Sequence, residues 1–313
     1  MKAMKAPVFD LYRGTSHDGP GLRSTVFFLG CPLSCKWCHN PEGIGENRIW
    51  WQPQGCIGCG ECKDACLQKA VSSGQEGISI DDEICLLCGN CVEYCPAKAL
   101  ALVAEERDLD YLFKEVLKDK AYYDRTGGGV TASGGECLLH HEIIKEFFIG
   151  LQKSGVNTAL DTSGFVSWPV LESVLPHTDF VLYDLKLFDT ELHRKYTGQS
   201  NELILDNARN LAKSTYPYEL WIRTPLVSGI TDTTENIGAL AGFIREELHG
   251  EAARWELCAF NNSCIKKYQQ LGLDWPFKEH KPITRRQADE LKKTAVASGL
   301  NEDQIAVTGI ISE

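Results

Sequence analysis

Eight cysteines between residues 56 and 95 constrain the fold of this chain more than any other feature. They form one quartet and its copy 29 positions later: Cys56, Cys59, Cys62 and Cys66, then Cys85, Cys88, Cys91 and Cys95. In both copies, two, two and three residues separate successive cysteines. A segment this small buries little apolar core and needs metal staples. The repeat therefore predicts a compact domain built around metal ligands.

Each copy matches the cysteine run of bacterial two-cluster ferredoxins, in which the fourth cysteine binds the other cluster. The proline after that cysteine is present as Pro96 but is replaced by Leu67 in the first copy. We expect a ferredoxin-like α+β domain over residues 50–104 with two [4Fe-4S] clusters; paired zinc knuckles are the alternative. The expected ligand sets are Cys56, Cys59, Cys62 and Cys95 for one cluster, and Cys85, Cys88, Cys91 and Cys66 for the other. An electron relay and a structural role are both open.

A separate run, 30–40, contains three more cysteines: Cys31, Cys35 and Cys38. A cubane cluster ordinarily has four cysteine ligands. Three ligands leave one metal open to bind and activate a small molecule, as in catalytic metal sites. A zinc or redox loop is the alternative. It is disfavoured because structural zinc completes four ligands and His39 directly follows Cys38, too close to serve as the fourth.

The run around Trp37, the aromatic residue before the third cysteine, resembles the signature of the radical S-adenosylmethionine (SAM) superfamily. Two further runs resemble the activating enzymes of glycyl radical enzymes within it: Asp18–Gly21 (Asp-Gly-Pro-Gly) and the glycine-rich 127–136. The resemblance implies a partial (β/α)6 radical SAM barrel over 1–49 and 105–313, interrupted by the ferredoxin-like insert. It also implies that Asp18 lies near the target peptide.

The same resemblance implies contacts with SAM. In the family, the Gly-Gly-Glu portion of the glycine-rich run holds the SAM amino group, and we expect this run to be a loop, because it is too glycine-rich for a strand interior. Asp161, Thr162 and Asp184 are expected near the methionyl end of SAM, with a monovalent cation. Lys186 is expected to pair with the SAM carboxylate, and Arg223 to donate a charge-assisted hydrogen bond to SAM. Trp37 and Asn261 complete the set, although some relatives carry Pro-Tyr-His where this chain has 259–261. In the glycine-rich run, the implied contacts are Gly134, Gly135 and Glu136.

Apolar periodicity predicts alternating strands and helices in the rest of the chain. Strands are expected at 25–29, 156–160, 180–182, 220–222 and 255–260, and helices at 109–122, 141–152, 203–213, 235–248 and 284–298. Repeated β-α units form a parallel sheet covered by helices. Periodicity alone does not separate a partial barrel from a doubly wound sheet.

Composition excludes several functions. The net charge of −11 and the pI near 5.3 argue against a nucleic-acid surface. The amino-terminal residues lack a signal-peptide pattern, and no apolar run approaches the roughly 20 residues that span a bilayer. Cysteines at ligand spacing suit a reducing cytoplasm. Cys137, Cys258 and Cys264 lack partners at ligand spacing, so we expect packed, reduced thiols.

These features together predict an enzyme with three [4Fe-4S] clusters and SAM. As the resemblance implies, it would reduce SAM to a 5′-deoxyadenosyl radical that takes a hydrogen atom from a glycine of a glycyl radical enzyme. A low-potential flavodoxin or ferredoxin is the expected electron donor. A different radical SAM reaction, on a peptide or small molecule, and a ferredoxin-type electron carrier are the alternatives. The identity of the partner is open.

Overall fold

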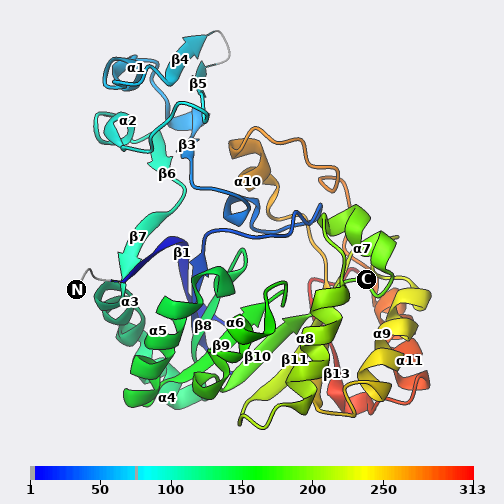
Figure 1. Cartoon of the computed structure of the whole chain (residues 1–313). Coiled ribbons are helices and arrows are strands. Elements are labelled where there is room, and N and C mark those ends of the chain that lie inside the picture. The colour runs from blue at the N-terminus through cyan, green and yellow to red at the C-terminus, as the bar shows by residue number, and fades with distance from the viewer. Residues whose placement is uncertain (1–3, 75–76) are drawn as a thin grey trace.

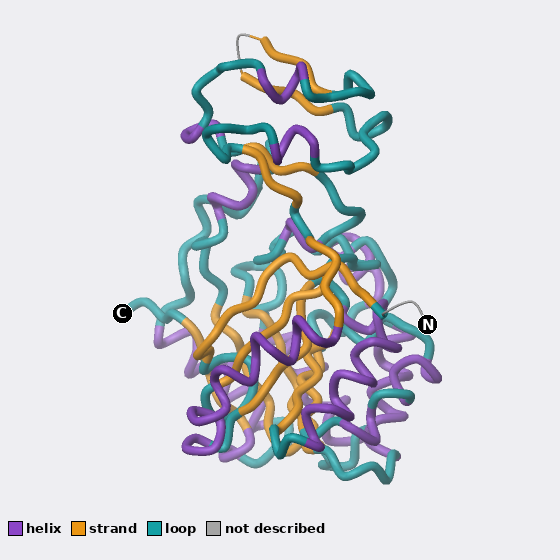
Figure 2. Tube along the Cα trace, turned by 90° about the vertical axis from the view of Figure 1, so that its left-hand side faces the viewer, coloured by secondary structure: helices purple, strands orange, loops and turns teal. Residues whose placement is uncertain are grey.

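The computed structural model describes residues 4–74 and 77–313. A large α/β domain carries a small cysteine-rich insert that stands away from it on two adjoining chain segments (Figures 1 and 2). Across the described residues, no helix has both the length and the apolar character needed to cross a membrane.

The large domain is built on one curved, open sheet of nine strands in the order β13-β12-β11-β10-β9-β8-β2-β1-β7. All neighbours from β2 to β13 are parallel, whereas β1 pairs antiparallel with both β2 and β7. The strands are β1 (Lys5–Thr15), β2 (Arg23–Phe28), β7 (Glu105–Asp108), β8 (Gly129–Gly134), β9 (Asn157–Thr162), β10 (Phe180–Asp184), β11 (Glu219–Leu226), β12 (Ala252–Ala259) and β13 (Ile305–Gly309). The edge strands β13 and β7 do not pair with each other, so the barrel is partial.

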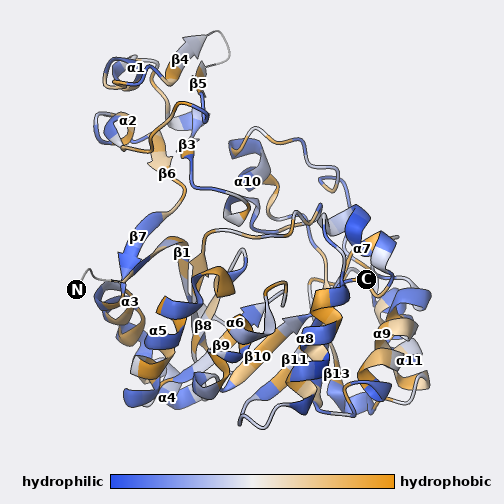
Figure 3. Ribbon diagram, viewed as in Figure 1, coloured by the Kyte–Doolittle hydropathy of each residue, from blue (hydrophilic) through white to orange (hydrophobic). Residues whose placement is uncertain are grey.

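Helices cover the outer side of this sheet and bury apolar residues against it (Figure 3). They are α3 (Leu109–Val116), α4 (Lys120–Thr126), α5 (His141–Lys153), α6 (Trp168–Glu172), α8 (Glu202–Lys213), α9 (Thr234–Glu246) and α11 (Arg285–Ala297). Two other helices, α7 (Thr190–Thr197) and α10 (Ile265–Gln270), contact the three-cysteine loop instead. In α5 the buried residues include Ile143, Ile144 and Phe147, at the spacing of a single helical stripe. This packing confirms the predicted parallel α/β architecture.

The predicted helix at 109–122 is not one helix. It divides into α3 and α4 around the 3-10 turn Leu117–Asp119. The break brings Asp119 against the sheet, where its carboxylate accepts a hydrogen bond from Ser24 Oγ at 2.8 Å. Apolar periodicity does not reveal such a turn, because a short 3-10 segment changes the spacing of the buried residues only slightly.

The expectation that 127–136 is a loop is wrong: Gly129–Gly134 form β8, an inner strand between β2 and β9. Glycine is required there by close packing. A Cβ on Gly129 would overlap the carbonyl oxygen of Asn157, and one on Gly134 would overlap that of Phe28. The glycines therefore mark close backbone approach inside the sheet.

Arg23 ties the Asp-Gly-Pro-Gly turn to the inner strands. Its fully buried guanidinium donates to Thr131 Oγ1 at 2.7 Å and Asn157 Oδ1 at 2.8 Å. It also donates to the carbonyl oxygens of Val130 at 2.9 Å and Pro20 at 3.2 Å. Each buried donor thus has an acceptor, as burial of a charge requires.

The insert contains two short ladders and two one-turn helices. Its elements are β3 (Ile49–Trp51), α1 (Glu61–Asp64), β4 (Val71–Gly74), β5 (Gly77–Ile80), α2 (Asn90–Glu93) and β6 (Leu100–Leu102). β3 pairs with β6 and β4 with β5, both antiparallel. The two helices begin at equivalent left-handed glycines, Gly60 and Gly89.

The two ends of the insert are held together where they leave the large domain. Asn47 donates from Nδ2 to the carbonyl oxygen of Ala104 at 2.8 Å and accepts from its amide at 2.9 Å. The amide of Val103 also donates to the carbonyl oxygen of Arg48 at 2.9 Å. This closed base leads directly into the β3–β6 ladder.

Candidate functional site

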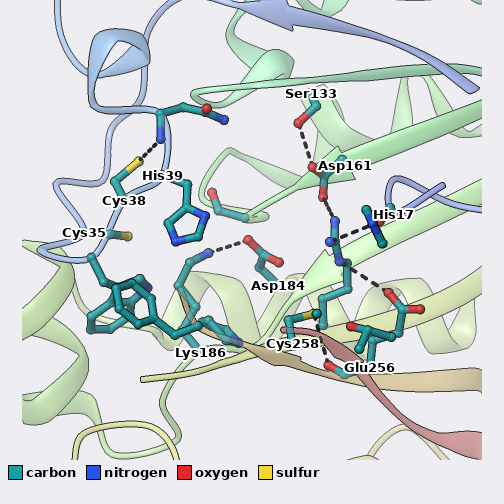
Figure 4. Close-up of a pocket in the computed structure, with 18 of the residues that line it drawn as sticks. His17, Cys35, Cys38, His39, Ser133, Asp161, Asp184, Lys186, Glu256 and Cys258 are labelled. Atoms are coloured by element: carbon teal, nitrogen blue, oxygen red, sulfur yellow. Dashed lines mark hydrogen bonds and ion pairs between the residues drawn. The ribbon is translucent and has the colours of Figure 1, made fainter. Parts of the chain in front are cut away.

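One cavity of about 600 Å³ lies where the carboxyl ends of the parallel strands face the three-cysteine loop. Cys31, Cys35 and Cys38 all line it, together with residues that follow β8, β9, β10, β11 and β12. Figure 4 shows Cys35 and Cys38 opposite the charged side chains of the strand ends. Active sites of β/α barrels occupy this end of the sheet.

Backbone hydrogen bonds hold the cysteine loop over the cavity. The amide of Gly30 donates to the carbonyl oxygen of Gly43 at 3.0 Å. The amides of Ser34 and Lys36 donate to the carbonyl oxygens of Thr197 and Tyr196, at 2.7 and 3.0 Å. The loop is therefore fixed at both its start and its middle.

The three thiols of this loop line the cavity and carry raised pKa values. Burial raises the pKa of the Cys31 thiol to about 12 and that of Cys38 still further, so iron must displace the proton for a thiolate to form. In the described part of the chain, no three His, Cys, Asp or Glu side chains converge closely enough to hold a single metal ion. A cubane needs no such convergence, because each cysteine binds a different iron.

The floor of the cavity is glycine. Gly134 and Gly135 line it, and a Cβ on Gly135 would overlap the carbonyl oxygen of Gly30. The Gly135 amide donates to the Phe28 carbonyl oxygen at 2.9 Å. The absence of side chains lets the cysteine loop lie directly on the end of β8, where both glycines line the cavity.

The predicted contact of Glu136 with the cavity is not found. Its carboxylate is fully buried and accepts from Thr162 Oγ1 at 2.7 Å and from the amide of Leu138 at 3.2 Å. Ser163 donates twice, from its amide at 2.9 Å and its hydroxyl at 2.5 Å. Burial raises the pKa of Glu136, which these four hydrogen bonds oppose. The carboxylate therefore fastens β8 to the end of β9 and does not line the cavity.

The predicted charged residues meet as two ion pairs. Lys186 Nζ lies 2.6 Å from Asp184 Oδ2, and Arg223 Nη1 lies 3.1 Å from Asp161 Oδ1. Ser133 Oγ donates to the second oxygen of Asp161 at 2.6 Å. Burial raises the pKa of Asp161 to about 6, although Arg223 lowers it.

Arg223 has unused capacity for hydrogen bonding. Its Nε is buried without a hydrogen-bond partner and lies 3.6 Å from Glu256 Oε2. Because Asp161 and Asp184 each contact a basic side chain, they do not form a free carboxylate pair. A monovalent cation near these residues and Thr162 stays a prediction.

Trp37 and Asn261 lie at the cysteine side of the cavity. Trp37 is buried and packs against Tyr196 and Phe277, with ring centroids 6.1 and 6.5 Å away. The carbonyl oxygen of Asn261 lies 2.8 Å from His39 Nε2. Both residues thus anchor the loop that carries the cysteines.

Asp18 does not line the cavity, although Ser16 and His17 beside it do. Its carboxylate accepts from Thr25 Oγ1 at 2.7 Å. The carbonyl oxygen of His17 accepts from Arg223 Nη2 at 3.3 Å. The turn thus forms part of the rim through Ser16 and His17, of which His17 is shown in Figure 4.

Sequence reasoning missed a group of lining residues on the last two strands: Arg254, Glu256, Cys258, Thr308, Gly309 and Ile310. Strand alternation could have found Glu256 and Cys258, which share one face of β12. Cys137 and Cys264 are buried as predicted, but Cys258 faces the cavity.

The insert brings together both predicted quartets. Cys56, Cys59, Cys62 and Cys95 surround one small cavity, with Ile78 and Leu100 beside them. Burial raises the pKa of Cys91, and the neighbouring thiols of Cys85, Cys66 and Cys88 raise it further. The equivalent fourth cysteines accept amide hydrogen bonds at their sulfur atoms, Cys66 from Ala70 and Cys95 from Ala99, both at 3.2 Å.

Two family models match parts of this chain. The profile of the radical SAM superfamily matches residues 88–241, and that of 4Fe-4S dicluster domains matches 55–99. A radical SAM methyltransferase from Sphaerobacter thermophilus shares the fold, with a TM-score of 0.52 and 13% identity over 98% of this chain and 77% of that chain.

Full-length relatives are more similar in sequence. The (2S)-3-sulfopropanediol dehydratase activating enzyme of Klebsiella oxytoca is 37% identical over 89% of both chains. The trans-4-hydroxy-L-proline dehydratase activating enzyme of Clostridioides difficile is 36% identical over 95% of this chain and 98% of its own.

Proposed function

The chain belongs to the glycyl-radical-enzyme activating enzymes of the radical SAM superfamily, and from that membership we propose which residues carry its activity. It is a radical SAM oxidoreductase that activates a partner glycyl radical enzyme. When bound, the cluster and SAM supply a 5′-deoxyadenosyl radical that takes a hydrogen atom from one glycine of the partner.

One observation carries the proposal: a three-cysteine loop, a glycine floor and buried ion pairs line the same cavity. Its volume of about 600 Å³ suits a ligand the size of SAM. Cys31, Cys35 and Cys38 hold the first [4Fe-4S] cluster. The open backbone at Gly134 and Gly135 receives the amino group of SAM, and Glu136 acts only by fastening β8 to β9.

The ion pairs orient the methionyl end. Lys186 and Arg223 carry charges complementary to its carboxylate, and their partners Asp184 and Asp161 keep both cations in place before SAM arrives. The Nε of Arg223 makes no hydrogen bond and lies 3.6 Å from Glu256 Oε2, so a small movement of this guanidinium would offer one more donor to SAM. No side chain needs to act as an acid or base, because a hydrogen atom carries its own proton.

Aromatic residues exclude water from the cysteine side. Trp37, Phe260, Tyr268, Trp275 and Phe277 form a cluster separate from the main core. A dry site protects a reactive intermediate from solvent. The partner's glycine loop would enter past the rim at Ser16, His17 and the neighbouring Asp18, which requires it to leave its own core.

The insert holds two further [4Fe-4S] clusters with crossed ligation. The grouping of Cys95 with the first quartet and of Cys66 with the second supports this assignment. We assign these clusters a relay role from a low-potential flavodoxin or ferredoxin. The reducing cytoplasm is the proposed location, since thiolate ligands require it.

The relay is tested by the double variant Cys59→Ala/Cys88→Ala. A protein donor should reduce the first cluster more slowly in the variant, while dithionite should reduce it at an unchanged rate. If the folded variant accepts electrons from the protein donor at the original rate, the accessory clusters are structural.

The SAM site is tested by equilibrium binding to the anaerobically reconstituted protein. Lys186→Met should weaken SAM binding about tenfold or more, as expected for one charge-assisted hydrogen bond. Lys195→Met, on the exposed side of α7, is the matched control. Failure of the unsubstituted protein to bind SAM with its clusters filled would contradict the assigned site and favour an electron carrier.

The partner is tested with dehydratases and decarboxylases of the glycyl radical class. With SAM and reductant, the cognate enzyme should develop a glycyl radical signal in electron paramagnetic resonance (EPR). A short peptide copying its glycine loop should be a poorer hydrogen donor. SAM cleavage without a radical on any such enzyme would favour a different radical SAM substrate.

A further inference from the structure

A segment more than 220 residues beyond the cysteine loop holds that loop through side-chain hydrogen bonds. We call residues 264–277, which include α10, the clasp. Tyr268 donates from its hydroxyl to the carbonyl oxygen of Cys38 at 2.9 Å. Trp275 donates from Nε1 to the carbonyl oxygen of Lys36 at 2.9 Å. Both acceptors belong to the turn that presents the third cysteine.

The two donor rings are themselves fixed. Tyr268 and Trp275 are buried and stack on each other, with ring centroids 4.7 Å apart and planes inclined by 12°. They pack in one apolar cluster with Trp37, Phe260 and Phe277. Because Trp37 lies between Lys36 and Cys38, the clasp contacts the turn through both its backbone and its buried side chain.

A second contact of the clasp leads to the sulfur of Cys38. Lys267 Nζ donates to Asn40 Oδ1 at 2.8 Å and lies 2.6 Å from Glu42 Oε1. The amide of Asn40 donates to Cys38 Sγ at 3.4 Å. Lys267 thus fixes the residue whose N–H points at a sulfur that would bind iron.

Hydrogen bonds to ligand sulfur atoms and exclusion of solvent set the reduction potential of an iron–sulfur cluster. We propose that the clasp positions Cys38 and its N–H···S hydrogen bond, and so sets the potential and retention of the first cluster. Tyr268, Lys267 and Trp275 are positioning residues, since none of them lines the cavity. This inference rests on the proposed cluster at Cys31, Cys35 and Cys38.

Tyr268→Phe is the primary test because it removes one hydroxyl and keeps the stacked ring. In the fully reconstituted enzyme, the first cluster is recognised as the one whose EPR signal changes with SAM. The midpoint potential of this cluster should shift. An iron chelator should remove the cluster about ten times faster, which is the smallest effect usual when a hydrogen-bond partner of a metal ligand is lost. The accessory clusters should keep their potentials.

Lys267→Met/Glu42→Gln tests the second contact without leaving a buried, unpaired carboxylate. It should lower the potential of the first cluster, because a weakened N–H···S bond favours the oxidised form. Lys266→Met, at the exposed neighbouring position, is the control and should change neither readout.

Unchanged potential and chelation rate in Tyr268→Phe and in the double variant would overturn the role of the clasp. A merely structural role would lower thermal stability without moving the potential, which also overturns the proposal. If the unsubstituted protein binds no SAM-responsive cluster, the proposed function fails, and that outcome is visible before any variant is made.

Discussion

The large domain and the insert use cysteines in opposite ways. In the large domain, an apolar core drawn from the sheet and its helices stands below the three-cysteine loop, which lies on top as an addition. In the insert, cysteines are members of the core itself, with Cys62 and Cys91 buried beside Ile49, Val71 and Leu100. The same ligand chemistry therefore serves reactivity in one region and folding in the other.

The sharpest way to separate the two regions is to remove one ligand from each. Cys38→Ala should lower 5′-deoxyadenosine formation with SAM and dithionite to the level of a protein-free control, because the open-iron cluster is lost. Cys59→Ala should retain product formation, since dithionite reaches the first cluster directly. Equal loss in both variants would show that the regions do not act separately.

Removal of iron should affect the stability of the two regions differently. A strong chelator under reducing conditions should unfold the insert, whose small core depends on its clusters. The barrel should stay folded on its apolar core. Hydrogen exchange should then reach unprotected rates in residues 77–102 while β9 and β10 remain protected; protection throughout would mean that the insert folds without metal.

Glycine substitution distinguishes tight packing from backbone conformation. Gly135→Ala should destabilise the barrel by about 3 kcal/mol or more, because its Cβ would meet backbone that cannot move aside. Gly60→Ala in the insert, at φ +84° with open space around it, should cost only about 1 kcal/mol.

Chemical denaturation of the barrel and hydrogen exchange of the insert provide these values. A smaller effect at Gly135 than at Gly60 would contradict the close approach of β8 to the cysteine loop.

Loss of a helix cap should give the smallest difference in unfolding free energy between the barrel and the insert. The barrel helix α9 begins with Thr233, whose hydroxyl accepts from the amide of Asn236 at 3.1 Å, whereas α1 and α2 have no side-chain cap. Thr233→Ala should lower the unfolding free energy of the barrel by about 1 kcal/mol. Exchange in the insert should not change, and a matching loss there would reveal cooperative unfolding of both regions.

The sequence predicted the insert better than the catalytic cavity, for a physical reason. Cysteine spacing is a local property, so the quartets that meet in the insert could be read directly. Periodicity also predicted the parallel α/β architecture of the large domain, but it missed β1, β7, β8, β13 and the split near Leu117. The partial barrel itself was implied by the family resemblance.

The errors arose where packing between distant segments decides the outcome. The glycine-rich sequence of β8 is typical of a loop. Glycine is required there because the backbone of β2 and β9 packs closely against β8, and both strands lie far away in sequence. Glu136 matches a ligand motif, and its oxygens accept hydrogen bonds from Thr162 and Ser163, which local sequence does not reveal; its contact with SAM stays a prediction. The clasp had no sequence signal, since Tyr268 and Trp275 acquire their role only by reaching Cys38 and Lys36.

The closed base at Asn47 and Ala104 limits how strongly the insert can affect the folding of the barrel. Because hydrogen bonds at the base already join the two chain segments, the distance between these segments in the barrel does not depend on the structure of the insert beyond the base. Loop-closure entropy rises only slowly with length, by about 0.6 kcal/mol for each doubling. The barrel can therefore tolerate an insert that is longer, shorter or exchanged for another, without a change in the strand ends that line the cavity.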